Sequence, residues 1–277
     1  MMFPSFAQLP VDFDLQGHRG CRSIYPENSI PAFIHAVKLG VTTLELDVLV
    51  TKDNKVVVCH DPILNKNICF VDNCKEINKD IEMRIYHLTY EELQKFDCGC
   101  KGNPDFPDQK KISVKIPLLS EMIDSVEQYI LENKLRKVNY NIEIKSKAEN
   151  DQILTPSIKE FTGLVYKEIS EKEMKDRVFV QSFDVRALQE MKTIDPDIKL
   201  ALLVSNIKSY KQNIKKLGFN PDIYSPYYKL LNKNIVQKLH ASGIRVIPWT
   251  VNSKVKIQKL TDMGVDGIIT DDPRLLK

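Results

Sequence analysis

The sequence of 277 residues lacks three features that define large classes of protein. No apolar run approaches the roughly 18 residues needed to cross a bilayer, so we expect no stable membrane insertion. The net charge is only +3 and no basic stripe carries interleaved aromatic residues, so nucleic acid is not an expected partner. No G-x-G-x-x-G follows the first strand-like run, which argues against an open dinucleotide-binding sheet.

The first 16 residues also lack the positively charged start and the sustained apolar core of a signal peptide. A cytoplasmic location is therefore the first expectation, and a periplasmic or secreted one applies if a signal peptide has been removed. Six cysteines are present: Cys21, Cys59, Cys69, Cys74, Cys98 and Cys100. Free thiols are the first expectation, local disulfides the second and zinc the third, because C-x-C is an awkward spacing for zinc ligands.

What the chain does contain is a regular alternation of strand-like and helix-like runs. The strand-like runs are 13–20, 42–51, 138–146, 177–183, 198–205, 222–228, 244–251 and 265–272. The helix-like runs, in which apolar residues recur every three or four positions, are 29–40, 118–133, 157–174, 185–195, 207–218, 232–243 and 253–264. This alternation predicts an α/β fold of parallel strands with right-handed crossovers, closed as an eightfold (β/α) TIM barrel. An open doubly wound sheet is the alternative.

Residues 65–116 interrupt this alternation with a stretch rich in Asn, Lys, Asp and Cys. A segment this long without the repeat indicates an insertion with a functional role. We therefore predict one barrel domain over 1–277 with an insertion subdomain over 65–116. Because the insertion leaves the barrel near the end of a strand-like run, we expect it to cap the open end, with a surface decoration remote from the pocket as the alternative.

Three acidic residues lie inside strand-like runs, where acids are costly to bury. Glu45 and Asp47 are two apart and so point to one side of their strand, and Glu143 with Lys145 repeats that spacing on the next barrel strand. Three adjacent carboxylates repel unless a cation lies among them, and oxygen ligands suit Ca²⁺ or Mg²⁺. A network of ion pairs with Lys145 and Arg19 is the alternative, and the residues alone leave both open.

Two histidines stand at the ends of strand-like runs. His18 lies between two glycines in "GHRG", and His60 follows the apolar run "KVVVC". Two histidines that flank an acidic cluster are the pair that acid–base catalysis needs, one to take a proton from the nucleophile and one to protonate the leaving oxygen. His35, His87 and His240 lie elsewhere and are expected to be structural or exposed.

The ordered combination of "GHRG", "PENS", "ELDVLVTKDNKVVVCHD" and "IEIK", followed by "WTVN" and "GVDGIITDDP", resembles the glycerophosphodiester phosphodiesterase family. The resemblance covers nearly the whole chain. It implies a barrel with a small insertion after the second histidine. It also implies metal-dependent hydrolysis of small glycerophosphodiesters, such as glycerophosphocholine or glycerophosphoethanolamine, to glycerol 3-phosphate and an alcohol.

The resemblance also implies roles for single residues. The acid–base pair would be His18 and His60, the ligands of one divalent cation Glu45, Asp47 and Glu143, and the phosphate contacts Arg19 and Lys145. Glu27, in the "PEN" motif, would be a further ligand or an orienting group. Phe183 and Trp249 lie at strand ends and are expected to wall the pocket as substrate contacts, with plain barrel core as the alternative for Phe183.

Two other functions are alternatives to this one. A barrel phospholipase that acts on intact phospholipid or sphingolipid head groups needs an exposed apolar rim, whereas the insertion here is polar. A barrel that only binds phosphodiesters would be expected to lack an acid, a base or a ligand, and all are present. The sequence leaves open the head group, the metal, attack by water or through a cyclic phosphate, and a homodimer.

Overall fold

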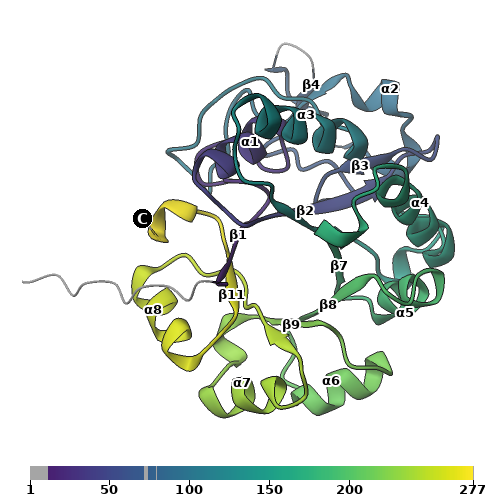
Figure 1. Cartoon of the computed structure of the whole chain (residues 1–277). Helices are drawn as coiled ribbons and strands as arrows, with labels where there is room; N and C mark the ends of the chain where they lie inside the picture. Colours follow the sequence, from purple (N-terminus) through teal and green to yellow (C-terminus); the bar gives the residue numbers. More distant parts are fainter. Residues whose placement is uncertain (1–11, 72–73, 79, 277) are drawn as a thin grey trace, which may run out of the picture.

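The computed structural model describes residues 12–71, 74–78 and 80–276, in which strands and helices alternate around a ring (Figure 1). The ring strands are β1 (Asp14–Gly17), β2 (Thr43–Val50), β6 (Asn139–Ile144), β7 (Val178–Ser182), β8 (Lys199–Val204), β9 (Ile223–Pro226), β10 (Arg245–Val246) and β11 (Gly267–Thr270). They run parallel in the order β10-β9-β8-β7-β6-β2-β1-β11. The predicted TIM barrel is confirmed and the open-sheet alternative is wrong. The expectation for the first 16 residues falls largely on 1–11, outside the described residues.

Helices cover the outside of the ring. They are α1 (Ile30–Lys38), α3 (Leu119–Glu132), α4 (Ile158–Glu171), α5 (Val185–Ile194), α6 (Tyr210–Leu217), α7 (Lys233–His240) and α8 (Lys254–Met263). Their starts follow local capping signals. Ser157, for example, forms a capping box with Glu160 at the start of α4. Within the described residues, no helix is long and apolar enough to cross a membrane.

The strand β10 is much shorter than the predicted run 244–251. Pro226 in the neighbouring β9 has no N–H to give to the carbonyl of Ile247. Pairing in the same register resumes beyond this point, where the N–H of Trp249 donates to the carbonyl of Pro226 at 3.1 Å. Among the described residues no ladder joins β10 to β11. Single backbone hydrogen bonds close the ring instead: the N–H of Ile269 donates to the carbonyl of Pro248 at 3.0 Å, and that of Val251 to Ile269 at 2.9 Å. The barrel is thus closed at this seam by scattered bonds rather than by a continuous ladder.

The strand β2 is buried on both faces, and its alternation decides what each face carries. Leu44, Leu46 and Val48 belong to the large apolar core between the ring and its helices. Glu45 and Asp47 point the other way, into the barrel, as the spacing predicts. The next ring strand, β6, places Glu143 directly opposite Asp47. Acidic side chains from two neighbouring strands are thereby collected inside the barrel.

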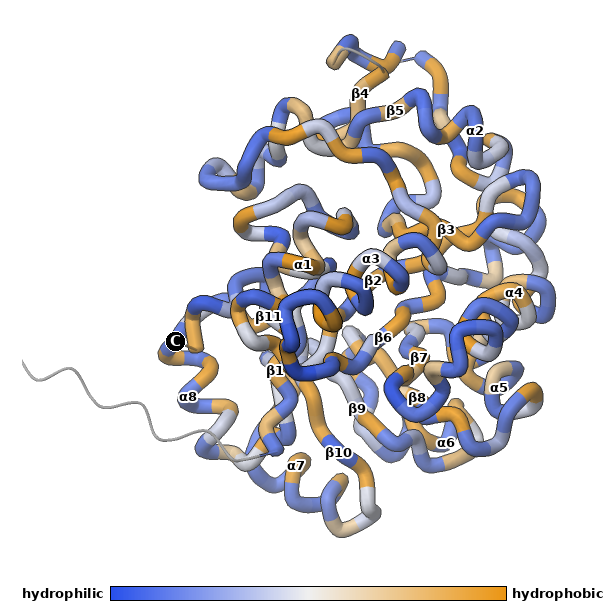
Figure 2. The backbone as a smooth tube through the Cα atoms, turned by 45° about the horizontal axis from the view of Figure 1, so that its top comes forward, coloured by the Kyte–Doolittle hydropathy of each residue, from blue (hydrophilic) through white to orange (hydrophobic). Residues whose placement is uncertain are grey.

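The segment between β2 and α3 forms a subdomain beside the barrel, at the top of Figure 2. It begins with β3 (Val56–Val58), antiparallel to β2, and contains the antiparallel pair β4 (Phe70–Val71) and β5 (Phe96–Asp97) and the short helix α2 (Tyr90–Leu93). Its side chains form a separate apolar cluster that also includes Leu49 of β2 and Val57 of β3. Leu49 lies on the same face of β2 as Glu45 and Asp47, so this cluster attaches the insertion to that face at the carboxyl end of the strand.

Candidate active site

A pocket of about 280 Å³ opens at the carboxyl ends of the ring strands. Eight of the nine predicted site residues line it: His18, Arg19, Glu45, His60, Glu143, Lys145, Phe183 and Trp249. The ninth, Asp47, lies beneath them and is 1% exposed. In this fold the catalytic groups come from the ends of several strands, and this pocket follows that pattern.

The turn after β1 delivers two functional residues at once. Arg19 has φ 51° and Gly20 has φ 83°, so the chain reverses within the sequence "GHRG". A Cβ on Gly20 would lie 2.6 Å from the backbone of Ala32, so only glycine lets α1 approach this closely. The positive φ of Arg19 is a strained conformation for a residue with a side chain. The glycines in this motif therefore serve the placement of His18 and Arg19.

The three predicted ligands form one cluster. Ligand oxygens of Glu45, Asp47 and Glu143 all lie within 4.8 Å of one another. Lys145 Nζ lies 2.7 Å from Glu143 Oε1 and 3.5 Å from Asp47 Oδ1, and Arg19 Nε lies 3.1 Å from Asp47 Oδ2. The ion pairs that the sequence left as an alternative are thus present, on the same side chains as the proposed ligands.

The electrostatics of the cluster show that these ion pairs do not balance it. Burial, with the charges of Asp47 and Glu143, raises the pKa of Glu45 well above its usual range. Burial also raises the pKa of Glu143, against the opposing charge of Lys145. For Asp47 burial acts in the same direction, but Arg19 and other nearby cations hold its pKa well below the usual range. Two of the three carboxyl groups therefore lack enough neighbouring positive charge.

A divalent cation fits this deficit. Asp47 Oδ1 is buried and accepts no hydrogen bond, which leaves an oxygen lone pair for a ligand bond. The donor set consists of carboxylate oxygens, which suit Ca²⁺ or Mg²⁺ and not zinc. These residues therefore have the ligand chemistry that a site for a divalent cation requires.

His18 is fixed by a residue from the far end of the chain. Its Nδ1 lies 2.5 Å from Asp271 Oδ1, at the end of β11, and its Nε2 lies 3.9 Å from Glu45 Oε2. Burial lowers the pKa of His18, although the hydrogen bond to Asp271 acts in the opposite direction. Asp271 is held in turn by Asn252 Nδ2 at 2.5 Å. With Nδ1 engaged, Nε2 is the nitrogen that faces the cluster.

His60 is held in a similar way by its neighbour. It lies two residues after β3, and its Nδ1 is 2.6 Å from Asp61 Oδ1. Burial raises the pKa of Asp61, but the hydrogen bond and charge of His60 outweigh it and the pKa falls below its usual value. The His60 side chain is 30% exposed, against 14% for His18. The site thus contains one less exposed and one more exposed imidazole, each oriented by a carboxylate.

A pair of arginines and one glutamate link the two histidine regions. Glu27 accepts a hydrogen bond from Arg19 Nη1 at 2.6 Å and pairs with Arg22 Nη2 at 3.0 Å. Arg22 Nε also lies 3.7 Å from Asp271 Oδ1. Glu27 is therefore an orienting residue for two guanidinium groups in this structure, and it lies outside the cluster of three carboxylates.

The two predicted aromatic residues form one wall of the pocket. The rings of Phe183 and Trp249 meet edge to face, with centroids 5.4 Å apart. Trp249 Nε1 donates to the carbonyl of Ser225 at 2.8 Å, which fixes the indole. Phe183 is 40% exposed, so the alternative of plain barrel core is wrong for it.

Sequence reasoning missed three residues that orient the site: Arg22, Gln181 and Asp271. Gln181 donates to Glu45 Oε1 at 2.7 Å from β7. The signal for Asp271 was available, because the last strand of a closed barrel lies beside the first and an acid after β11 must therefore approach His18. The other histidines lie away from the pocket: His87 Nε2 contacts the carbonyl of Ile153 at 3.0 Å, and His240 pairs with Asp266.

A second pocket of about 320 Å³ adjoins the first and shares Arg19, Arg22 and His60 with it. The insertion supplies its other side through Asn65, Asn67, Ile68, Asn103, Pro104 and Asp105. The returning segment of the insertion is tied to the loop after β1, because Gln109 Nε2 donates to the carbonyl of Arg22 at 2.7 Å. The insertion therefore contributes directly to the surface around the site.

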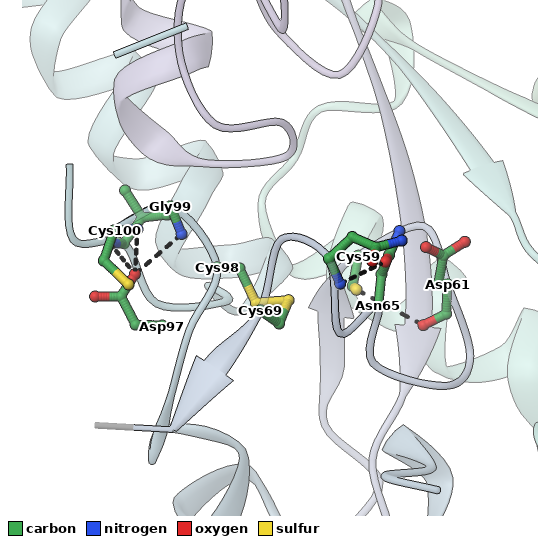
Figure 3. Close-up of a disulfide and its surroundings, with 10 residues drawn as sticks. Cys59, Asp61, Asn65, Cys69, Asp97, Cys98, Gly99 and Cys100 are labelled. Atoms are coloured by element: carbon green, nitrogen blue, oxygen red, sulfur yellow. Dashed lines mark hydrogen bonds between the residues drawn. A yellow bond between two sulfur atoms is a disulfide. The ribbon is translucent and has the colours of Figure 1, made fainter. Parts of the chain in front are cut away.

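The expectation of free thiols is wrong for four of the six cysteines. A disulfide joins Cys69 to Cys98 across the pair β4 and β5 (Figure 3), and a second joins Cys74 to Cys100. Phe70 pairs with Asp97 in that ladder, which sets Cys69 opposite Cys98. The two free cysteines, Cys21 and Cys59, have pKa values raised by burial, that of Cys21 to about 12.

Fold and site together define the class of the protein: a TIM-barrel enzyme whose strand ends hold a carboxylate cluster, two oriented histidines and several cations. The model of the glycerophosphoryl diester phosphodiesterase family matches residues 18–275. The chain belongs to this family and is a phosphodiester hydrolase.

Individual proteins show the same likeness over nearly the full length. A curated glycerophosphodiester phosphodiesterase from Bacillus altitudinis is 34% identical over 260 residues, 92% of this chain and 93% of that protein. A structure from Silicibacter pomeroyi, described as a glycerophosphoryl diester phosphodiesterase, superposes with a TM-score of 0.85 at 27% identity and covers 96% of this chain and 92% of its own. An Oleispira antarctica phosphodiesterase, solved with the product sn-glycerol-3-phosphate, has a TM-score of 0.75 at 23% identity over 96% of this chain and 94% of its own.

Proposed function

We propose that the chain cleaves small glycerophosphodiesters to glycerol 3-phosphate and an alcohol, with one divalent cation and with His18 and His60 as the acid–base pair. The observation that carries this proposal is the convergence of two carboxylate-oriented imidazoles on one pocket with a charge-deficient cluster of three carboxylates. Family membership supports the substrate class, and the product named for the Oleispira antarctica enzyme is the one expected here.

The proposed cation is Ca²⁺ or Mg²⁺, held by Glu45, Asp47 and Glu143. When bound, it supplies positive charge that stabilises the negative charge developing on the phosphoryl oxygens. Lys145 now lies against two of these carboxylates. The Lys145 ammonium and the Arg19 guanidinium therefore lie beside the proposed cation, where the phosphate of the substrate would bind. There they would bind the nonbridging oxygens of the phosphate.

Each histidine has one ring nitrogen free for proton transfer, because Nδ1 of each is engaged by an aspartate. His18 lies deep in the pocket beside Glu45, and His60 lies at the junction of the two pockets. We infer that one accepts the proton of the attacking oxygen and the other donates a proton to the leaving alcohol oxygen. The attacking oxygen belongs either to water or to the neighbouring glycerol hydroxyl, and in the second case the reaction passes through a cyclic phosphate. Both routes require the same acid–base pair.

The second pocket is the proposed site for the alcohol. It lies beyond His60 and carries the amides of Asn65, Asn67 and Asn103 and the carboxylate of Asp105. No phenylalanine, tyrosine or tryptophan is among the described residues that line it, so a quaternary ammonium would find no cage of such rings there. Its chemistry favours alcohols with hydroxyl groups or a primary amine. In this proposal the insertion 65–116 is the cap that selects the alcohol.

The two disulfides favour an oxidising compartment. Such bonds persist in periplasmic and secreted proteins and are rare in the cytosol. We therefore propose the periplasmic or secreted location, in place of the cytoplasmic one that the sequence placed first.

One assay tests the proposed activity. Purified protein is incubated with glycerophosphoethanolamine, glycerophosphoglycerol and glycerophosphocholine, with and without EDTA, and released glycerol 3-phosphate is measured. We expect release that EDTA abolishes and that added Ca²⁺ or Mg²⁺ restores, with the choline ester as the poorest substrate. EDTA already saturated with calcium is the control for effects unrelated to chelation. Full activity after dialysis against excess EDTA would leave the carboxylates as an ion-pair network only.

A further inference from the structure

A row of hydrogen-bonded side chains crosses the barrel interior and ends on the candidate metal site. At its lower end Gln16 Nε2 donates to Asp14 Oδ2 at 2.8 Å. Asn141 Nδ2 donates both to Gln16 Oε1 at 2.7 Å and to Gln181 Oε1 at 3.0 Å. Gln181 Nε2 donates to Glu45 Oε1 at 2.7 Å. We call Gln16, Asn141 and Gln181 the amide relay.

The amide relay is unusual because barrel interiors are normally filled by branched apolar side chains. The other side of this barrel follows that rule, with an inner cluster of Phe179, Ala201, Ile223, Ile247 and Ile269. The three relay side chains are at most 2% exposed. Buried amides are costly unless their groups are paired, and here nearly every group is.

The direction of each amide is fixed by the two ends of the row. Asp14 and Glu45 in their ionised forms can only accept, so the glutamines next to them must present their NH₂ groups outward. Both glutamine carbonyls then face the middle, where only a double donor satisfies them. Asn141 is that donor, and its own Oδ1 is consequently the group left buried without a partner.

The lower end of the row is itself immobilised. The hydroxyl groups of Thr42 and Thr43 both donate to Asp14 Oδ1 at 2.6 Å. At the upper end Glu45 receives Gln181 on Oε1 and the backbone N–H of Arg19 on Oε2 at 2.9 Å. Each oxygen of Glu45 is therefore held by one donor, which sets the plane of the carboxylate.

We propose that the amide relay orients Glu45 for cation binding, and that Asn141 and Gln181 are positioning residues for the proposed metal site. This inference rests on the proposed cation. Groups that hold a ligand's second oxygen fix its orientation, and their loss typically lowers metal affinity by about 10- to 100-fold. Asn141 reaches Glu45 only through Gln181, so an effect of Asn141 on the cation would be transmitted by the direction of the amides.

Two substitutions test the relay by calcium titration calorimetry on EDTA-stripped protein. Asn141→Asp replaces the double donor with a carboxylate of the same shape, which can only accept. Gln181 would then turn its NH₂ toward position 141 and its carbonyl toward Glu45, where two acceptors repel. We expect the calcium Kd to rise about 10- to 100-fold, and similarly for Gln181→Met, which removes the donor.

Thr162→Val is the matched control, since Thr162 is equally buried and its hydroxyl donates at 2.8 Å to Ile158 within α4, away from the site. Thr162→Val should bind calcium with the wild-type affinity, even if the loss of a buried hydrogen bond lowers its melting temperature. Wild-type calcium affinity in a folded Asn141→Asp protein would overturn the relay. If Asn141→Asp does not fold, an unchanged calcium affinity in Gln181→Met is by itself enough to overturn the relay. A wild-type protein that binds neither calcium nor magnesium would overturn the cation proposal and the relay together, whereas a loss confined to the variants supports both.

Discussion

The side chains of His18 and Asp271 are 253 positions apart in the sequence and meet at 2.5 Å where the first and last barrel strands lie side by side. The carboxylate fixes Nδ1 as the protonated nitrogen and leaves Nε2 to act in the pocket. Asp271→Asn keeps the shape, but an amide can present its NH₂ to Nδ1 and so favour the other tautomer.

We expect Asp271→Asn to lower kcat by about 10²-fold or more, with a small effect on stability. The adjacent Asp272→Asn is the matched control, because Asp272 pairs with Arg274 and not with a site residue. Steady-state kinetics on glycerophosphoethanolamine measure both variants. Equal kcat values for the two would show that Asp271 is not needed to orient His18.

The two strand-end histidines should be essential for turnover. His18→Ala and His60→Ala should each lower kcat by about 10²- to 10⁴-fold, the usual effect of losing a general acid or base. His87→Ala is the control, since His87 bonds the carbonyl of Ile153 and does not line either pocket. If one strand-end variant keeps near wild-type turnover, that histidine has only a structural role.

The cap should be tested by point substitutions and not by deletion. Removing 65–116 would strip the apolar cluster from Leu49 and Val57 and expose both. Asn103→Ala combined with Asp105→Ala removes two polar side chains from the alcohol side of the second pocket, together with the hydrogen bond from the Asp105 N–H to Asn103 Oδ1 at 3.0 Å. We expect KM for glycerophosphoethanolamine to rise about 3- to 30-fold, because one or two hydrogen bonds to the amine are lost.

The same double variant should bind calcium with unchanged affinity, since neither side chain is near the carboxylate cluster. Glu76→Ala, which removes an exposed negative charge from the insertion and is absent from the lining of both pockets, is the control for surface charge. Identical substrate preference in the double variant and the wild type would count against the insertion as the selector of the alcohol.

The disulfides predict a thiol count. In denaturant without reductant, Ellman's reagent should find two thiols, Cys21 and Cys59, and after reduction it should find six. Reduction should also lower the stability of the insertion by about 2–4 kcal/mol per bond, measured as a lower midpoint of unfolding in urea. A variant with serine at the four paired positions should be insensitive to reductant. Six thiols in oxidised protein would refute both bonds and the proposed compartment.

The fold could be predicted from sequence because each unit of the barrel carries its own periodic signal. Leu44, Leu46 and Val48 alternate with Glu45 and Asp47, which fixes the buried faces of β2 without any knowledge of its neighbours. The failures lie where the deciding contact is distant or local chemistry overrides the pattern. Pro226 of β9 interrupts the ladder with β10, so that β10 ends at Val246 although the apolar run continues past it.

The site residues likewise fall into those that the sequence predicts and those that it does not. Strand-end acids and histidines stand out in the sequence because they are out of place in apolar runs. Gln16, Asn141 and Gln181 do not, since a polar residue in a strand usually faces solvent and only the closed ring turns these three inward. The cysteine pairings depend on the register of β4 with β5, which spacing alone does not specify.

The scattered hydrogen bonds across the seam between β10 and β11 affect where the enzyme begins to unfold. Amide hydrogens that are held singly, such as those of Val251 and Ile269, should exchange with solvent sooner than those in the continuous ladder between β2 and β6. Asn252, which holds Asp271, lies directly after this seam. Opening there would release the partner of His18 before the rest of the barrel unfolds, so heat inactivation should precede the loss of helical circular dichroism.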